Sequence, residues 1–214
     1  MARRGLRLTL LGIGAMNSPR YAPAGLLVGW GRATVAIDGG PGAEPPAGVR
    51  AWLVTDEQAE LRAALRRLAA ARGVASPAAA AYTAGGLAVR PFPVEHTSHP
   101  AFGYQISAGG RTAVWAPEFW RFPDWARDAD LMFAEAAGWN RPIRFRGGVG
   151  GHACVLQVAA DAASHGVGRL VYAHIGRPAL RAMDAGLRPA YGEWGVEGRT
   201  YRLPPLPPGT AAAG

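Results

Sequence analysis

The sequence lacks lysine, has one cysteine and contains no long apolar run. All 23 basic side chains are arginines, against 15 acidic side chains, and the formal net charge is +8. The arginines are scattered and accompany an Ala/Gly/Pro bias that is typical of GC-rich bacterial genomes, so charge alone does not indicate a nucleic-acid partner. The single cysteine, Cys154, excludes an internal disulfide and predicts a reducing, cytoplasmic location.

The sequence pattern gives no sign of membrane insertion or secretion. No apolar run approaches the roughly 20 residues of a membrane-spanning helix, and the basic start leads into alternation rather than a cleavable apolar segment. A length of 214 residues, of which 49% are hydrophobic, suits one domain with a substantial core. We expect a single domain over residues 1–203 and a Pro/Ala-rich tail at 204–214 without fixed structure.

Hydrophobic periodicity predicts an α/β fold. Leu61, Leu65 and Leu68 repeat at helical spacing, with arginines opposite, and predict a helix over 56–72 that ends at Gly73. The same reasoning predicts helices at 123–129 and 153–165 and strands at 6–13, 25–30, 33–38, 50–55, 86–95, 102–108, 111–116, 130–135 and 168–173. Each β-rich half closes with a helix and a strand, which favours a four-layer αβ/βα sandwich.

Three histidines and one acid lie where a functional site is expected. His96 follows a strand edge, and His174 ends a buried strand. His152 follows a glycine run and is predicted to open a helix, whose N-terminus would suit an anion and place an acid beside a leaving oxygen. Glu118 lies in an apolar, aromatic stretch and needs a cation, a metal or hydrogen-bond donors. The alternative for each residue is a structural role with satisfied hydrogen bonds.

The acidic segment after Thr55 has two interpretations. Asp56, Glu57 and Glu60 precede or begin the predicted helix, as N-capping and the helix dipole would favour without any function. Thr55 and Gln58 also have the spacing of a capping box. Alternatively, Asp56 and Glu60 supply oxygens to a single metal ion.

Three other residues are assigned peripheral or structural positions. His99, three residues after His96, is expected at the rim of the site. His165 precedes Gly166 and fits the C-terminal end of a helix. Cys154 is expected to be a small buried residue.

Five segments, taken in order, resemble the metallo-β-lactamase fold. They are Leu8–Gly14, Val35–Gly42, His96–Tyr104, Val114–Glu118 and Gly151–His174. The similarity is greatest to tRNA 3′-processing endonucleases and to the cyclic phosphodiesterases of phosphonate breakdown. The resemblance implies an αβ/βα sandwich, metal-binding roles for His96 and His174, a metal-bridging carboxylate at Glu118 and assistance to catalysis by His152.

The metal motif of that fold is missing from this sequence. Its His-x-His-x-Asp-His pattern would follow Thr55, but the four ligand positions hold Asp56, Gln58, Glu60 and Leu61. Two-metal hydrolysis uses ions about 3.5–4 Å apart that clamp the attacking and leaving oxygens, so a complete two-metal centre is not expected. The segment that follows is also too short for the insertion that grips tRNA in the processing endonucleases.

The sequence therefore predicts a hydrolase-like protein with an altered metal site, acting on a small ester, lactone or cyclic phosphodiester. The cofactor would be one divalent ion, of zinc, iron or manganese, or none. The predicted metal ligands are His96, His174 and Glu118, completed by Asp56 or Glu60. The predicted catalytic residues are His152 and Glu118, with Asp38 close to the metal-motif segment.

The rival prediction is a metal-free, non-catalytic member of the fold that binds a small anionic ligand. Its ligand-binding residues would be Arg144, Arg146 and Arg177, which are also the predicted substrate-binding residues, together with the glycine-rich helix start. A nuclease is a weaker third reading, because the arginines favour it while the missing motif and insertion oppose it. Nucleic acid and membrane are therefore not expected as partners, and a homodimer is left open.

Overall fold

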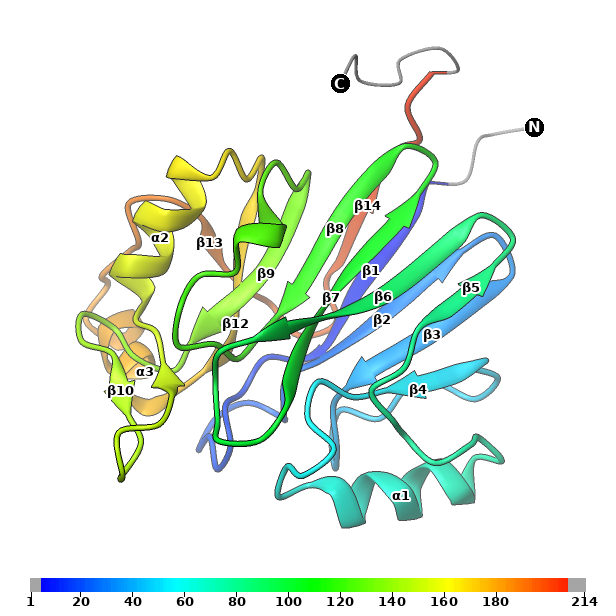
Figure 1. Ribbon diagram of the computed structural model, residues 1–214, viewed down its shortest axis with the longest axis horizontal. Coiled ribbons are helices and arrows are strands. Elements are labelled where there is room, and N and C mark those ends of the chain that lie inside the picture. The colour runs from blue at the N-terminus through cyan, green and yellow to red at the C-terminus, as the bar shows by residue number, and fades with distance from the viewer. Residues whose placement is uncertain (1–4, 208–214) are drawn as a thin grey trace.

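Two β-sheets that face each other form the centre of the molecule, as the computed structural model of residues 5–207 shows (Figure 1). The first sheet has the strand order β14-β1-β2-β3-β4, with β1 (Leu6–Gly12), β2 (Gly25–Trp30), β3 (Ala33–Asp38), β4 (Ala51–Leu53) and β14 (Thr200–Leu203). The second has the order β13-β12-β9-β8-β7-β6-β5, with β5 (Tyr82–Ala84), β6 (Leu87–Val94), β7 (Ala101–Ala108), β8 (Arg111–Ala116), β9 (Leu131–Ala136), β12 (Leu170–Ile175) and β13 (Glu193–Trp194).

Glycine-containing turns fix the register of two predicted hairpins. In the β2–β3 hairpin Trp30 pairs with Ala33, and Gly31 at the turn has φ +55°. In the β7–β8 hairpin Gly109 and Gly110 have φ +59° and +76°. Two successive residues with positive φ match the twist of the flanking strands, and glycine adopts this conformation without a Cβ clash.

The core lies between the two sheets. Leu6, Leu8 and Leu10 alternate inward along β1 and are fully buried, which is the period-2 pattern of a half-buried strand. Each such leucine contributes about 1.5–3 kcal/mol through its burial. Phe133 of β9 packs edge-on against Tyr201 of β14, with ring centroids 5.2 Å apart, so aromatic contacts join the two sheets directly.

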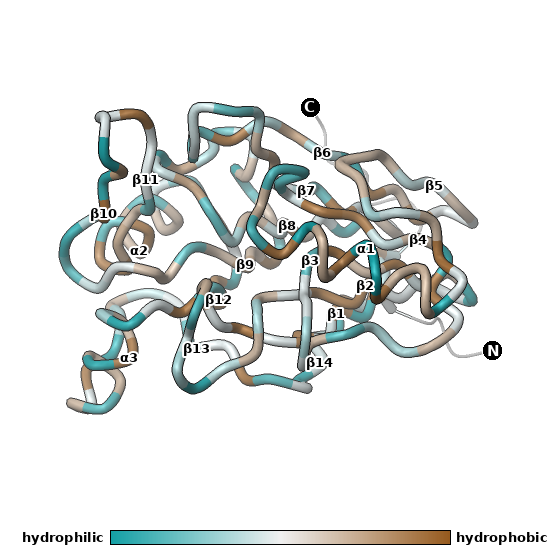
Figure 2. The backbone as a smooth tube through the Cα atoms, turned by 90° about the horizontal axis from the view of Figure 1, so that it is seen from below, coloured by the Kyte–Doolittle hydropathy of each residue, from teal (hydrophilic) through white to brown (hydrophobic). Residues whose placement is uncertain are grey.

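Helices cover the outer faces of the sheets and complete four layers. They are α1 (Arg62–Ala71), η1 (Asp124–Ala126), α2 (Val155–Ser164) and α3 (Arg177–Asp184). On α1, Leu65 and Ala69 pack against Trp52, which lies in β4, and against Val54, which follows β4. The helix α2 packs on β9 and β12, and Figure 2 shows α1 and α2 well apart, each beside its own sheet. The predicted αβ/βα sandwich is confirmed.

The segment predicted as a helix start is instead a loop. The helix α1 begins at Arg62, its N-cap residue Leu61 makes no side-chain capping hydrogen bond, and its first turn contains no acid. Residues 55–61, named the 55–61 loop from here on, form turns and bends. The capping interpretation of Asp56 and Gln58 is therefore wrong, because these residues lie outside the helix.

Sequence periodicity missed the C-terminal elements α3, β13 and β14. Residues 204–207 lie along the β7–β8 hairpin, where Leu206 donates its backbone N–H to the carbonyl of Gly109. Residues 1–4 and 208–214, with most of the predicted tail, lie outside the described residues. Within residues 5–207 no helix has the length and apolarity needed to cross a membrane.

Candidate functional site

The candidate site is a cavity of about 470 Å³ at one edge of the sandwich. Its chemical groups sit at the carboxyl ends of strands. Asp38 ends β3, Glu118 follows β8, and His174 lies at the end of β12. His96 follows β6, and the ends of these strands meet at the lower side of Figure 1. Open α/β sheets generally bind ligands outside the carboxyl ends of their strands.

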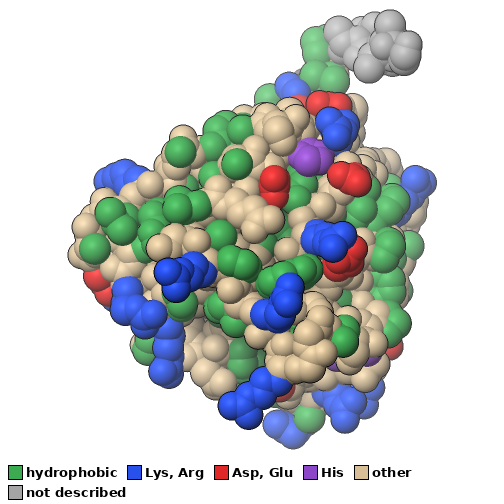
Figure 3. Space-filling view, turned by 60° about the vertical axis from the view of Figure 1, so that its left-hand side comes forward, with side chains coloured by type: hydrophobic (Ala, Val, Ile, Leu, Met, Phe, Trp, Pro, Cys, Tyr) green, Lys and Arg blue, Asp and Glu red, His purple; other side chains and the backbone are tan. Residues whose placement is uncertain are grey.

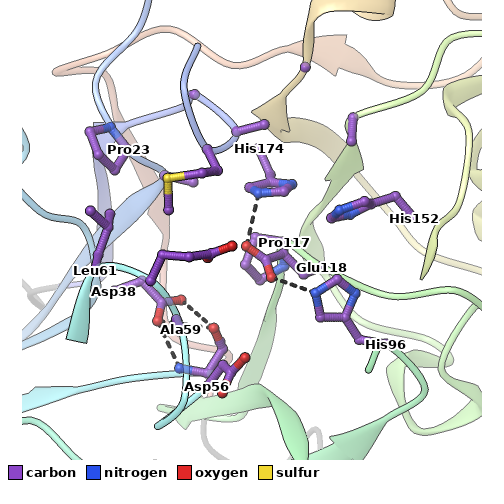
Figure 4. Close-up of a pocket in the computed structure, with 18 of the residues that line it drawn as sticks. Pro23, Asp38, Asp56, Ala59, Leu61, His96, Pro117, Glu118, His152 and His174 are labelled. Atoms are coloured by element: carbon purple, nitrogen blue, oxygen red, sulfur yellow. Dashed lines mark hydrogen bonds and ion pairs between the residues drawn. The ribbon is translucent and has the colours of Figure 1, made fainter. Parts of the chain in front are cut away.

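Glu118 lies between His96 and His174 at the centre of this cavity (Figure 4). One carboxylate oxygen lies 2.8 Å from Nε2 of His96, and the other lies 2.8 Å from Nε2 of His174. The Nδ1 atom of His96 is 2.9 Å from the carbonyl of Gly151 and donates to it, because a carbonyl only accepts. Both Nε2 atoms thus face the same carboxylate.

Glu135 of β9 is a fully buried carboxylate that holds two of the site histidines. Its Oε1 accepts from the N–H of Ala137 and lies 3.2 Å from Nδ1 of His174. Its Oε2 accepts from the N–H of Phe119 and lies 2.8 Å from Nδ1 of His152. The sequence reasoning missed Glu135, although a carboxylate at the end of a wholly apolar strand was a usable signal.

The carboxylates and imidazoles of the site stabilise each other's charged forms. Burial raises the pKa of Glu135, but His152 and His174 outweigh it and lower that pKa to about 2. Burial likewise opposes ionisation of Glu118, yet His174 and His96 hold its pKa well below the usual range. Burial lowers the pKa of His174, whereas Glu118 and Glu135 raise it to about 10. A metal ion must therefore displace a proton from His174 at neutral pH.

Two site residues hold an unusual backbone conformation. His174 has φ +58° and Asp38 has φ +54°, in the left-handed region that side chains other than glycine rarely adopt. Such residues cost about 1–3 kcal/mol and cluster at functional sites.

Asp38 lies beside the 55–61 loop, as predicted, and accepts from the N–H of Thr55 and from Nε1 of Trp115. Burial raises the pKa of Asp38 to about 7.

The 55–61 loop contributes two acids to the cavity, of which one is hydrogen-bonded and the other has no described partner. Asp56 accepts from the N–H of Gln58 through Oδ1, and its Oδ2 lies 2.8 Å from Nε2 of His99. Glu60 lines the cavity, is exposed and makes no hydrogen bond or ion pair with any described residue. Of the two predicted oxygen ligands, Glu60 is available and Asp56 is already held.

The donor set does not fit the two-metal centre of the resembled fold. His96 and His174 lie on opposite sides of Glu118 in Figure 4, and Leu61 replaces one ligand outright. Within residues 5–207, one group of three has ligand atoms within 4.8 Å of one another, formed by Glu135, His152 and His174. The site thus contains a His/Glu group at metal-ligand spacing, but its Nδ1 atoms already contact Glu135.

Only one of the three predicted substrate-binding arginines lines the cavity. Arg177, the first residue of α3, lies at its edge and is exposed. Arg144 and Arg146 do not line it, because Ile143 and Phe145 face the cavity and neighbouring side chains on an extended segment point the other way. The guanidinium of Arg144 lies over the ring of Trp120 instead, 5.3 Å from its centroid.

The predicted anion site at the start of α2 is also corrected. His152 lies in β11 (Gly151–His152), which pairs with β10 (Ile143–Arg144), and α2 begins three residues later. The backbone N–H groups of Val155 and Leu156 donate to the carbonyls of Gly138 and Trp139. These N–H groups are therefore not free for a ligand. Cys154 is buried and His165 ends α2, as predicted.

Basic side chains do not gather into a single binding surface on the face carrying α2 and α3. Figure 3 shows them distributed over this face, with apolar side chains between them. Two of the arginines there are paired with acids, Arg169 with Glu193 and Arg20 with Asp184. The net charge therefore does not by itself define a site for a polyanion.

Backbone contacts between the β10–β11 loop and His96 predict unequal effects of two glycine substitutions. Gly150→Ala is expected to lower the melting temperature markedly, because a Cβ there would lie 1.8 Å from the carbonyl oxygen of His96. Gly147→Ala is the matched control, with a positive φ of +90° but nothing within 4 Å, and should lower it by about 2–8 °C. Equal shifts in thermal unfolding would contradict the docking of this loop on His96.

Solved structures of the metallo-β-lactamase fold superpose on more than nine-tenths of the chain. The metallo-β-lactamase fold protein YhfI from Bacillus subtilis superposes with a TM-score of 0.70 and is 17% identical in sequence. The match covers 92% of this chain and 99% of that protein. A diphosphatase of the PhnP family gives 0.69 at 16% identity over 92% and 97%. Human tRNase Z, short form (ELAC1), gives 0.65 at 13% identity over 94% and 100%. No protein-family model matches the sequence, and neither does any curated protein sequence.

The chain therefore has the metallo-β-lactamase fold, which confirms the predicted fold class. At these identities the likeness establishes the fold alone. In this chain Glu118 contacts both His96 and His174 directly, and the 55–61 loop beside them contains acids and no histidine.

Proposed function

We propose that the protein is a hydrolase of small esters that uses one divalent metal ion. The observation that carries the proposal is the orientation of His174: its Nδ1 is held by the buried Glu135 and its Nε2 faces Glu118 in the cavity. Metal-binding histidines in general donate their other ring N–H to a carboxylate or a carbonyl, which fixes the tautomer and the ring.

The proposed metal ligands are Glu118, His174 and Glu60. Glu60 is chosen over Asp56 because it lines the cavity without a protein partner, whereas Asp56 is held by His99. A divalent ion held by these residues would lower the pKa of a bound water molecule and supply hydroxide near neutral pH. His96 acts through Glu118, whose carboxylate it orients from the other side.

Within this proposal His152 is the proton donor to the leaving oxygen. Its Nδ1 is fixed on Oε2 of Glu135 at 2.8 Å, so its Nε2 is the nitrogen left for substrate. His152 lines the cavity and its side chain is 15% exposed, which leaves room for contact with a bound ester. A positioned acid of this kind contributes about 10²–10⁴-fold to a rate.

The composition of the cavity favours this proposal over an anion-binding pocket. Four acids line it, Asp38, Asp56, Glu60 and Glu118, together with a single arginine. Glu118 is paired with His96 and His174, and Asp56 with His99, which leaves the carboxylate of Glu60 without a described partner and able to attract a cation. The volume of about 470 Å³ suits a small molecule. Two neighbours are named as a diphosphatase and a tRNase, so phosphodiesters come first in substrate screening.

The test is metal content together with turnover in the intact protein. We expect about one equivalent of zinc, iron or manganese per chain and hydrolysis of bis(p-nitrophenyl) phosphate, a cyclic phosphodiester, p-nitrophenyl acetate or a lactone. Glu60→Gln should weaken metal binding by at least about 10-fold. Glu57→Gln is the matched control, because Glu57 accepts from the N–H of Ala79 and does not line the cavity. Failure to take up any metal from excess ions would overturn the proposal.

A further inference from the structure

We propose that Asp56 and His99 form a second proton-transfer pair in the cavity, which accepts the proton of the attacking water. The inference rests on the proposed hydrolase function and assigns it a base. Both residues line the same cavity as His152, and Figure 4 places Asp56 and His152 on different sides of Glu118. His99 would then accept the proton of the attacking water, and His152 would donate a proton to the leaving oxygen.

The geometry of the pair is that of a carboxylate orienting an imidazole. Oδ2 of Asp56 lies 2.8 Å from Nε2 of His99, and Oδ1 is fixed by the N–H of Gln58 at 2.7 Å. An ionised carboxylate only accepts, so Nε2 carries the proton and Nδ1 keeps its lone pair. No described residue forms a hydrogen bond with Nδ1 of His99, so this nitrogen can accept one from a water molecule.

Burial and exposure of the pair fit a reacting group rather than a surface ion pair. The side chain of Asp56 is 9% exposed and that of His99 is 27% exposed, so the carboxylate is shielded and the imidazole reaches solvent. The hydroxyl of Thr97 donates to the carbonyl of His99 and fixes its backbone. A buried acid behind a partly exposed histidine is the arrangement that orients a general base.

The pair also explains what replaced a metal ligand of the resembled fold. Asp56 occupies the first ligand position of the missing motif, and in this chain it contacts His99, which is 43 residues away. The position at which the resembled fold has a metal-binding histidine thus holds an aspartate that orients the proposed base, His99.

The proposed step balances as the addition of water across an ester bond. One O–H bond of water breaks and its proton goes to Nδ1 of His99, while the water oxygen bonds to the carbon or phosphorus atom. The bond from that atom to the leaving oxygen breaks, and Nε2 of His152 gives that oxygen a proton. Afterwards His99 loses its proton to solvent and His152 regains one.

The test is His99→Ala with and without added imidazole. We expect kcat to fall about 100-fold with a smaller change in KM and no loss of bound metal, and imidazole to restore a large part of kcat. Asp56→Asn should lower kcat about 10-fold. Imidazole should not stimulate the wild type or His165→Ala, whose histidine ends α2 outside the cavity.

The possible results separate this inference from the proposed function. A His99→Ala variant with wild-type kcat overturns the pair while the hydrolase stands. A loss of kcat that imidazole does not restore also overturns the pair. In that case the contact between Asp56 and His99 would only hold two loops together, and its removal would lower activity by disturbing the structure. A wild type without metal and without turnover overturns the hydrolase, and the pair with it.

Discussion

Replacing His174 by asparagine is expected to reduce both metal binding and hydrolysis to below about 1% of wild type. Loss of a group that merely supports a ligand costs about 10–100-fold, so loss of a nitrogen ligand should cost more than about 100-fold. Asparagine is chosen because it tolerates the left-handed backbone at φ +58° better than most side chains. The measurement is metal per chain after dialysis, together with kcat/KM on the best substrate found.

The control for this variant is His165→Asn, which removes a histidine outside the cavity. It should retain metal and turnover. Circular dichroism of His174→Asn separates loss of the site from loss of the fold. If the folded variant keeps one equivalent of metal, His174 is not a ligand and the proposed ligand set with Glu118 and Glu60 is wrong.

Glu135→Gln is expected to have the largest effect on stability. The two oxygens of Glu135 each contact two nitrogens, those of Ala137 and His174 on one side and those of Phe119 and His152 on the other. A glutamine offers one acceptor oxygen and turns an NH₂ group toward donors. Breaking a buried charge pair costs about 3–5 kcal/mol, which corresponds to a fall in melting temperature of roughly 6–20 °C.

The pH dependence of stability provides a second measurement on the same variant. Glu135 has its pKa lowered to about 2, so its contribution is present above about pH 4.5 and is lost as the pH falls toward 2. His174 has its pKa raised to about 10, so its contribution is present below about pH 6.5 and is lost as the pH rises toward 10. Asp38 has its pKa raised to about 7, so its contribution is present below about pH 3.8 and is lost as the pH rises toward 7.

Wild-type unfolding free energy, measured with a chelator so that no metal competes, should therefore be greatest near pH 4.5, fall as Asp38 loses its proton up to about pH 7, and fall further as His174 loses its proton above about pH 6.5. In Glu135→Gln the acid-side loss should be reduced and the alkaline loss should be smaller, because His174 keeps only Glu118 as its carboxylate. A variant with the wild-type pH profile would show that Glu135 does not carry the charge assigned to it.

Local patterns in the sequence determined most of the fold. The alternation of Leu6, Leu8 and Leu10 predicted β1, and the turn glycines placed both hairpins, because strand period and turn chemistry are encoded within a few residues. The resemblance of five ordered segments to the metallo-β-lactamase fold pointed to His96, Glu118 and His174, and the end of a buried strand also pointed to His174.

Hydrogen-bond partners across long separations were decided only by the tertiary structure. Asp56 contacts His99 over 43 residues, and Glu135 contacts His174 over 39, yet neither pairing has a signature in composition or period. The acids after Thr55 have the composition of a helix start, but Asp56 and Glu57 bind His99 and the N–H of Ala79 in distant loops, Glu60 faces the cavity, and the helix begins later. A local pattern fixes which residue types are present, and the folded chain alone fixes which of them meet.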